Sequence, residues 1–147
     1  MASKTPELSL AVQYAAAVAG LPPRYRLRRW VARSLEAESA QVTLRFVAAA
    51  EGRALNAQFR GKDYATNVLS FAYAPPPHVA GDLVLCTPVL RAEARAQKKS
   101  LEAHCAHLVV HGMLHLQSYD HENDSEAARM EQRERDILAR LGFPDPY

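Results

Sequence analysis

Alternating apolar and polar positions predict four β-strands in this chain. Leu8–Tyr14 and Gln41–Ala48 alternate with the two-residue period of a strand that turns one face to a core. Val68–Tyr73 and Leu83–Cys86 are shorter apolar runs bounded by turn residues. The last run is continuously apolar, which predicts that its strand is buried on both faces. The three prolines and the histidine at positions 75–78 predict a loop outside the sheet.

Apolar residues at helical spacing predict five helices. The predicted helices cover Arg24–Ala37, Ala49–Phe59, Val89–Lys98, Ala103–Gln117 and a last segment from Asn123 or Asp124 to Leu141. Thr87 followed by Pro88 predicts an N-cap and start for the third of these helices, and Gly142 predicts the end of the last one. The whole pattern predicts an α/β (α+β) fold, a single domain over residues 1–147 with one mixed four-stranded sheet packed with about five helices.

The composition is that of an ordinary globular chain. With 147 residues, 48% of them hydrophobic, the chain can build one sizeable core. A net charge of +2 gives no bulk attraction to a polyanion. No segment approaches the roughly 20 apolar residues that span a bilayer. Cys86 and Cys105 lie in apolar runs and form no CxxC pair, as free cysteines in a reducing compartment do. We therefore expect a cytoplasmic protein with no membrane partner.

The helix predicted at Arg24–Ala37 carries a strongly basic face opposite its apolar residues. The basic residues are Arg24, Arg26, Arg28, Arg29 and Arg33. Such a run is either a solvated helix face or a surface that binds phosphate groups. The residues alone leave both interpretations open.

Histidines gather in the segment His104–His121, HCAHLVVHGMLHLQSYDH. His111 and His115 lie one helical turn apart, so their imidazoles project from the same face. At this spacing one helix offers two nitrogen ligands to a metal ion. His121 follows after a short turn, and three imidazoles suit zinc, nickel, copper or ferrous iron. Three protein ligands leave one position of a tetrahedral ion open, so the pattern predicts a catalytic metal site.

Two alternatives to this site come from the same residues. Histidines on an apolar helix are often core residues bonded to backbone carbonyls, so the pair His111 and His115 could arise by chance. The spacing also resembles that of the metzincin zinc proteases, HExxHxxGxxH. Gly112 stands where those proteases carry their general-base glutamate, and Ser118 stands where they carry a turn glycine. A glycine cannot shuttle a proton, which argues against peptide hydrolysis by that mechanism.

Four segments together resemble the YbeY family of single-domain, metal-dependent endoribonucleases. They are LNAQFRGKDYATNVLSF at 55–71, GDLVLC at 81–86, HCAHLVVHGMLHLQSYDH at 104–121 and the tail EAARMEQRERDILARLGFPDPY. The segments occur in the family's order and at similar spacing, and they extend over nearly the whole chain. In combination they are far more specific than three histidines alone.

The resemblance implies one zinc ion, or another divalent transition metal such as nickel, on His111, His115 and His121. It also implies a functional arginine at Arg60, in the family's YRGKD motif, with Phe59 in the aromatic position. Family members act on single-stranded RNA, mature the 3′ end of 16S rRNA and take part in ribosome quality control. The implied partners are therefore rRNA and the ribosome or the assembly components of its small subunit.

The loop that follows the second predicted helix supplies the candidate substrate contacts. Arg60 suits the stabilisation of phosphate charge, because a guanidinium binds phosphate oxygens bidentately and stays charged. Lys62 and Asn67 share the loop and are candidate substrate-binding residues, although Asn67 could instead cap a turn.

The histidine segment contains further residues with expected supporting roles. Asp120, next to the third histidine, is a candidate acceptor that orients an imidazole. His104 and His107 are interpreted as residues that pack beside the ligands or support them. Ser118 replaces the glycine of the family motif, and a left-handed conformation there would cost about 1 kcal/mol of strain.

Two other functions stay open from the residues alone. One is a peptidase or amidase that uses the same metal, against which Gly112 argues. The other is a non-catalytic ribosome-assembly factor with a structural metal and a basic face that docks on rRNA. A nuclease should lose cleavage when Arg60 is changed while it keeps its metal, and a docking factor should not.

Overall fold

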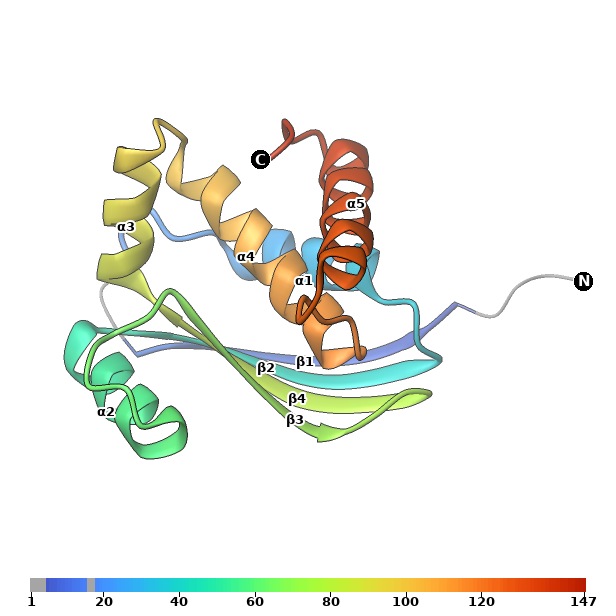
Figure 1. The fold of residues 1–147 in the computed structure, drawn as a ribbon, viewed down its shortest axis with the longest axis horizontal. Helices are drawn as coiled ribbons and strands as arrows, with labels where there is room; N and C mark the ends of the chain where they lie inside the picture. Colours follow the sequence, from blue (N-terminus) through green and yellow to red (C-terminus); the bar gives the residue numbers. More distant parts are fainter. Residues whose placement is uncertain (1–4, 16–17) are drawn as a thin grey trace, which may run out of the picture.

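The structure, a computed structural model, describes residues 5–15 and 18–147. In chain order its elements are β1 (Glu7–Tyr14), α1 (Arg24–Ser34), β2 (Ser39–Val47), α2 (Ala49–Arg60), β3 (Val68–Ala74), β4 (His78–Cys86), α3 (Thr87–Ala96), α4 (Leu101–Leu116) and α5 (Asp124–Leu141) (Figure 1). Within these described ranges the four strands and five helices confirm the predicted fold class.

The strands form one mixed sheet in the order β1-β2-β4-β3. β2 pairs in parallel with both β1 and β4, and β3 joins β4 as the antiparallel partner. β3 therefore forms one edge of the sheet and leaves its outer backbone edge free of strand pairing. This edge borders the candidate functional site.

Helices cover the two faces of the sheet unequally. α1, α4 and α5 lie on one face, with α4 nearest the sheet, and α2 lies on the other face near one end (Figure 1). Leu83 and Leu85 of β4 point into the larger core beneath α4, while Val84 and Cys86 belong to a smaller cluster on the α2 side. The prediction that this run is buried on both faces is confirmed.

Helix α4 lies close to β4 because two glycines leave room for the approach. A β-carbon on Gly112 of the helix would lie 2.7 Å from a methyl carbon of Leu83. A β-carbon on Gly81 of β4 would lie 2.6 Å from a methyl carbon of Leu116 and 2.7 Å from the carbonyl oxygen of Phe71. Side chains at either glycine would force the helix away from the sheet.

The start of β4 differs from the prediction. The strand begins at His78, which was predicted to lie in a loop, and that prediction is wrong. His78 pairs with Ser39 of β2, and the backbone amide of Ser39 donates to the carbonyl oxygen of Pro77 at 3.2 Å. The prolines precede the strand, so they do not interrupt its ladder of hydrogen bonds.

The end of α1 also differs, because a side chain from a distant helix takes over its backbone hydrogen bonds. The helix ends at Ser34 and not at Ala37. The side-chain amide of Gln117 donates to the carbonyl oxygen of Ser34 at 2.8 Å. Its oxygen accepts from the backbone amides of Glu36 at 2.7 Å and Ala37 at 3.1 Å.

Two of three predicted helix caps are confirmed. The Asn123 side chain accepts from the backbone amide of Glu126 at 2.9 Å at the start of α5, and Gly142 ends that helix in a left-handed conformation with φ 90°. The predicted cap at Thr87 is wrong, because Thr87 is already inside α3 and Cys86 occupies the cap position. The Thr87 hydroxyl has no hydrogen-bond partner among the residues that the structure describes.

The basic face of α1 is partly engaged by the protein itself. Arg24 lies over the ring of Tyr14, with 4.9 Å from its guanidinium carbon to the ring centroid. Arg26 pairs with Glu102, and Arg28 donates to the carbonyl oxygen of Leu8 at 3.3 Å. These contacts favour the interpretation of a solvated structural face over a dedicated phosphate site.

Of the helices in the described part of the chain, none has the length and apolar character needed to cross a membrane.

Candidate metal centre

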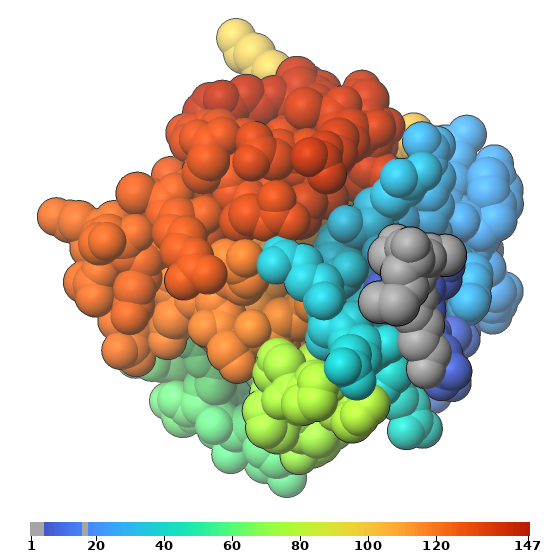
Figure 2. Space-filling view, turned by 90° about the vertical axis from the view of Figure 1, so that its right-hand side faces the viewer, coloured from blue at the N-terminus to red at the C-terminus, as the bar shows by residue number. Residues whose placement is uncertain are grey.

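The structure brings the three predicted histidine ligands together at the surface end of α4. His111 and His115 project from adjacent turns with parallel rings, whose centroids lie 6.5 Å apart. His121 comes from the loop after the helix, and its ring lies 5.9 Å from that of His111 and 6.1 Å from that of His115. The end of α4 and the following loop lie at the surface beside α5 (orange in Figure 2).

Two of these imidazoles are oriented by acceptors on their Nδ1 atoms. Nδ1 of His111 lies 2.7 Å from a carboxylate oxygen of Glu134, and Nδ1 of His115 lies 3.0 Å from the carbonyl oxygen of Tyr119. A carbonyl or carboxylate oxygen can only accept, so each Nδ1 carries the proton. Nε2 is then unprotonated in both neutral rings, which is the form that binds a metal ion. This donor set fits a zinc-type ion.

The loop from Gln117 to His121 has a defined conformation. Ser118 adopts a left-handed conformation with φ 78°, as expected if it takes the place of the motif glycine. Tyr119 is anchored by its hydroxyl, which donates to the Glu36 carboxylate at 3.0 Å. Asp120 accepts from the backbone amide of His121 at 2.8 Å. The sharp turn at Ser118 and these two bonds place His121 beside the helix.

The buried carboxylate of Glu134 on α5 was not predicted from the sequence. Its side chain is 0% exposed. Burial by itself raises the pKa of a carboxyl group. Hydrogen bonds from His107, His111 and Tyr147 outweigh burial and lower the pKa of Glu134 to about 2. Glu134 therefore stays charged beside the first histidine of the predicted ligand set.

A sequence signal for Glu134 did exist. The apolar stripe of α5 includes Met130, Ile137, Leu138 and Leu141, all of them buried. Glu134 lies four residues after Met130 and three before Ile137, which places it on the same stripe. A charged residue in a core-facing position requires a buried partner. That partner is a histidine of α4.

A cavity of about 600 Å³ lies in front of the three imidazoles. Its walls come from the end of α2, the free edge of β3, the end of α4 and the loop after α4. Arg60, the last residue of α2, lines the cavity together with Phe59. The structure thus brings Arg60 and the three histidines to one cavity, although Arg60 and His111 lie 51 positions apart in the chain.

The other two predicted substrate contacts are not brought into this cavity. Asn67 donates to the Glu93 carboxylate at 3.1 Å and accepts from the backbone amide of Val68 at 2.7 Å. These bonds match the alternative role of Asn67 in capping a turn. Lys62 is exposed in the loop beyond Arg60 and does not line the cavity.

The supporting residues take partly different roles from those predicted. Asp120 bonds to the backbone of His121, while Glu134 and the Tyr119 carbonyl orient imidazoles in its place. Nε2 of His107 lies 3.3 Å from the Glu134 carboxylate, so His107 supports the same buried charge. His104 pairs with Glu93 of α3 at 2.9 Å, away from the cavity.

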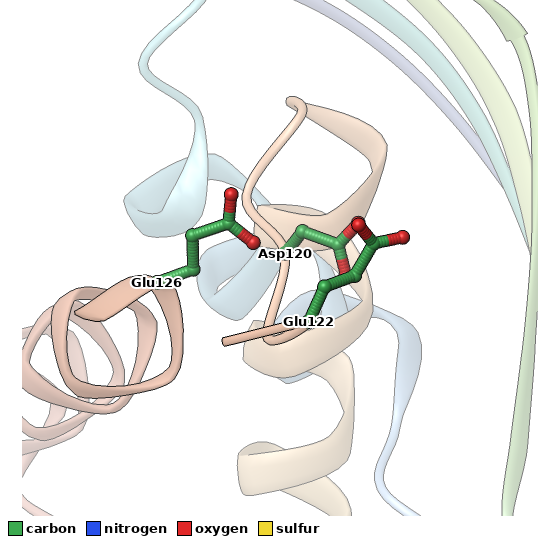
Figure 3. Close-up of side chains that lie close together, drawn as sticks. All are labelled: Asp120, Glu122 and Glu126. Carbon is green, nitrogen blue, oxygen red and sulfur yellow. The ribbon is translucent and has the colours of Figure 1, made fainter. Parts of the chain in front are cut away.

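Three carboxylates lie next to the third histidine. Asp120, Glu122 and Glu126 place oxygen atoms within 4.8 Å of one another (Figure 3). Asp120 and Glu122 also line the histidine cavity, so carboxylates do stand near the histidines. Oxygen ligands suit hard cations, whereas imidazoles suit zinc and its neighbours. Glu126 also lies at the N-terminus of α5, where negative charge is favourable without any ion.

The sequence matches the family described as Endoribonuclease YbeY over residues 23–142. The chain belongs to the YbeY family. The match covers every helix of the structure and three of its four strands, and it includes all residues of the candidate metal centre discussed above except Tyr147. Arg60 and the three histidines thus lie within the part of the chain that defines membership.

Proteins named Endoribonuclease YbeY are similar over almost the full chain. The one from Cupriavidus metallidurans is 56% identical, over 97% of this chain and 74% of that protein. The one from Paraburkholderia phymatum is 52% identical, over 99% of both. A solution structure of TM1509 from Thermotoga maritima has a TM-score of 0.57 and 22% identity, and covers 90% of this chain and 91% of that one. This last similarity supports the fold alone.

We expect Ser118→Gly to stabilise the protein by about 1 kcal/mol or less, because glycine adopts positive φ without the steric cost that serine carries. Urea unfolding followed by circular dichroism measures the difference. Lys98→Gly is a matched comparison, since Lys98 also has positive φ (56°) but does not line the histidine cavity. Destabilisation by Ser118→Gly would contradict the expected strain at this turn.

Proposed function

We propose that the protein is a metal-dependent endoribonuclease that cuts single-stranded RNA, with a role in maturing the 3′ end of 16S rRNA and in ribosome quality control. Family membership and the names of its close relatives support the reaction class. The observation that carries the proposal is the shared cavity, which Arg60 lines together with the three histidines. A phosphodiester in this cavity would meet a fixed cation and a metal-binding surface together.

We infer that His111, His115 and His121 hold one zinc ion, or another divalent transition metal such as nickel. The support is the donor chemistry, since Glu134 and the Tyr119 carbonyl leave Nε2 of the two helical imidazoles free to coordinate. A zinc ion bound there supplies a Lewis acid and lowers the pKa of water to about 7. Glu134 holds the His111 ring in position and partly offsets the positive charge of the ion.

Arg60 is the residue that we assign to the phosphate. It ends α2 and leads into a glycine with a left-handed conformation, Gly61, which turns the chain away from the cavity. A guanidinium at this position can bind two phosphate oxygens at once and becomes more important as their charge grows toward the transition state. Lys62 is exposed two residues later and is proposed to contact the RNA backbone outside the cavity. Asn67 is proposed to act indirectly, by holding the loop against Glu93.

Specific observations weigh against both rival functions. In a peptidase of the metzincin type, position 112 would carry a carboxylate, but here it is a glycine whose β-carbon would lie 2.7 Å from a methyl carbon of Leu83, so a side chain would require Leu83 to shift. A docking factor would use its basic helix, yet Arg24, Arg26 and Arg28 of α1 are engaged by protein groups.

A single domain that acts in the cytoplasm on ribosomal components is also proposed. The free, buried cysteines Cys86 and Cys105 are compatible with a reducing compartment.

We expect His115→Ala to lose the metal, because two remaining imidazoles are too few to hold zinc tightly. Elemental analysis of the purified protein measures the metal content. His104→Ala is the control, since His104 lies on the same helix but pairs with Glu93 and should leave the metal in place. Full metal content in the His115→Ala protein would refute the ligand assignment.

We expect Glu134→Gln to weaken zinc binding by about 10–100-fold, the usual effect of removing the carboxylate that orients a histidine ligand. Competition with a chromophoric chelator measures the zinc affinity without any RNA. Glu93→Gln is a matched control, because Glu93 also accepts from a buried imidazole of α4, that of His104, at 2.9 Å. Equal effects of the two substitutions would mean that Glu134 serves stability and not the metal.

We expect Arg60→Ala to keep the fold and the metal but to lower single-turnover cleavage of single-stranded RNA by at least about 100-fold, the scale of losing one electrostatic donor. Arg60→Lys should recover only part of the rate, because an ammonium cannot make the bidentate contact. Quenched-flow cleavage of a labelled RNA, with and without chelator, measures both. Cleavage by Arg60→Ala at the parental rate would remove Arg60 from the chemistry and favour the docking factor.

A further inference from the structure

An apolar groove of about 630 Å³ lies on the face of the sheet that carries α2. Leu55 and Phe59 of α2 form one side, and Phe71 and Tyr73 of β3 form the other. Val84 of β4 lines it as well. The helices α1, α4 and α5 lie on the opposite face of the sheet (Figure 1).

The groove adjoins the histidine cavity. Phe59, Ser70 and Phe71 line both spaces. Because β3 is the edge strand, its side chains reach both faces at the border of the sheet. A flexible polymer held at the histidines and Arg60 can therefore pass the edge of β3 and enter the groove.

Two aromatic rings in the groove are exposed and held in place. Phe59 is 57% exposed and Tyr73 is 67% exposed. The ring of Phe59 packs edge-on against Phe71, with centroids 5.1 Å apart and an angle of 73° between the planes. The Tyr73 hydroxyl donates to the Asp82 carboxylate at 2.7 Å. Rings that are already oriented lose little entropy when a flat partner stacks on them.

The charges in the groove disfavour phosphate there. Arg45 is neutralised by Glu51 through two hydrogen bonds of 2.6 and 2.9 Å. Asp82 then leaves the groove with a net negative charge, so a phosphodiester backbone is repelled. Arg60 in the neighbouring cavity attracts that backbone. This division of charge separates a site for phosphate from a site for the uncharged part of a nucleotide.

We propose that this groove is a nucleobase subsite, in which an unpaired base of the RNA strand stacks on Tyr73 or Phe59 while its backbone stays on the Arg60 side. The proposal rests on the proposed function and specifies its substrate. Stacking on an aromatic side chain needs a base that has left its own helix, so the subsite selects single-stranded RNA. Every base has a flat apolar face, so the contact tolerates different sequences.

The test compares two labelled single strands, an oligoadenylate and a matching strand whose riboses carry no bases. Their affinities for the metal-loaded protein are measured by fluorescence anisotropy, with a gel to establish that the strands stay intact. Tyr73→Ala should weaken binding of the oligoadenylate by at least about fivefold and change binding of the abasic strand by less than about twofold. Tyr73→Phe keeps the ring and should bind as the parent does. Tyr25→Ala should also bind as the parent does, since Tyr25 is equally exposed (69%) on α1, away from the groove.

Equal losses on both strands, or no loss on either, would overturn the subsite. A change in sedimentation on Tyr73→Ala without a change in RNA affinity would instead assign the groove to a second copy of the chain. Cleavage is assayed separately with the parental protein. A parent that shows base-dependent binding but cleaves no RNA would remove the proposed nuclease activity and leave the subsite standing. A parent that cleaves RNA, together with a Tyr73→Ala variant that binds both strands as the parent does, would remove the subsite and leave the nuclease activity standing.

Discussion

The close approach of α4 to β4 is the constraint on which the rest of the structure depends. Gly81 and Gly112 let the two elements touch where any side chain would separate them. The helix is consequently buried along most of its length, while His111 and His115 in its C-terminal half reach the surface. This packing also disfavours a catalytic carboxylate at position 112, because a side chain there would displace Leu83.

A second consequence of this burial is that polar atoms around α4 need partners inside the protein. Glu134 is a fully buried charge, and such a charge is costly unless it is paired and hydrogen-bonded. His107, His111 and Tyr147 provide those bonds. Gln117 does the same at the end of the helix, where its amide makes hydrogen bonds to the loop that follows α1. The helix that carries the histidines is thus fixed by polar contacts with α5 and with the end of α1.

Local patterns in the sequence were enough to predict each strand and helix that the structure describes and the pairing of His111 with His115, whereas the left-handed turn at Ser118 was a conditional expectation from the family motif. They could not give the features that depend on distant residues. The early end of α1 follows from Gln117, which is more than eighty positions away, and the start of β4 at His78 follows from its parallel pairing with β2. The position of Arg60 opposite the histidines came from the family motif and not from periodicity. Glu134 alone was visible as a charge on an apolar stripe and was overlooked.

The place of β3 at the edge of the sheet determines which part of a polymer can reach the histidines. The cavity shares Phe59, Ser70 and Phe71 with the groove on the other face, so the two spaces adjoin at this strand. A strand of RNA that occupies both spaces lies across the edge of β3 and presents an internal stretch to the histidines. The geometry of a single edge strand therefore suits scission within a strand over trimming from its end.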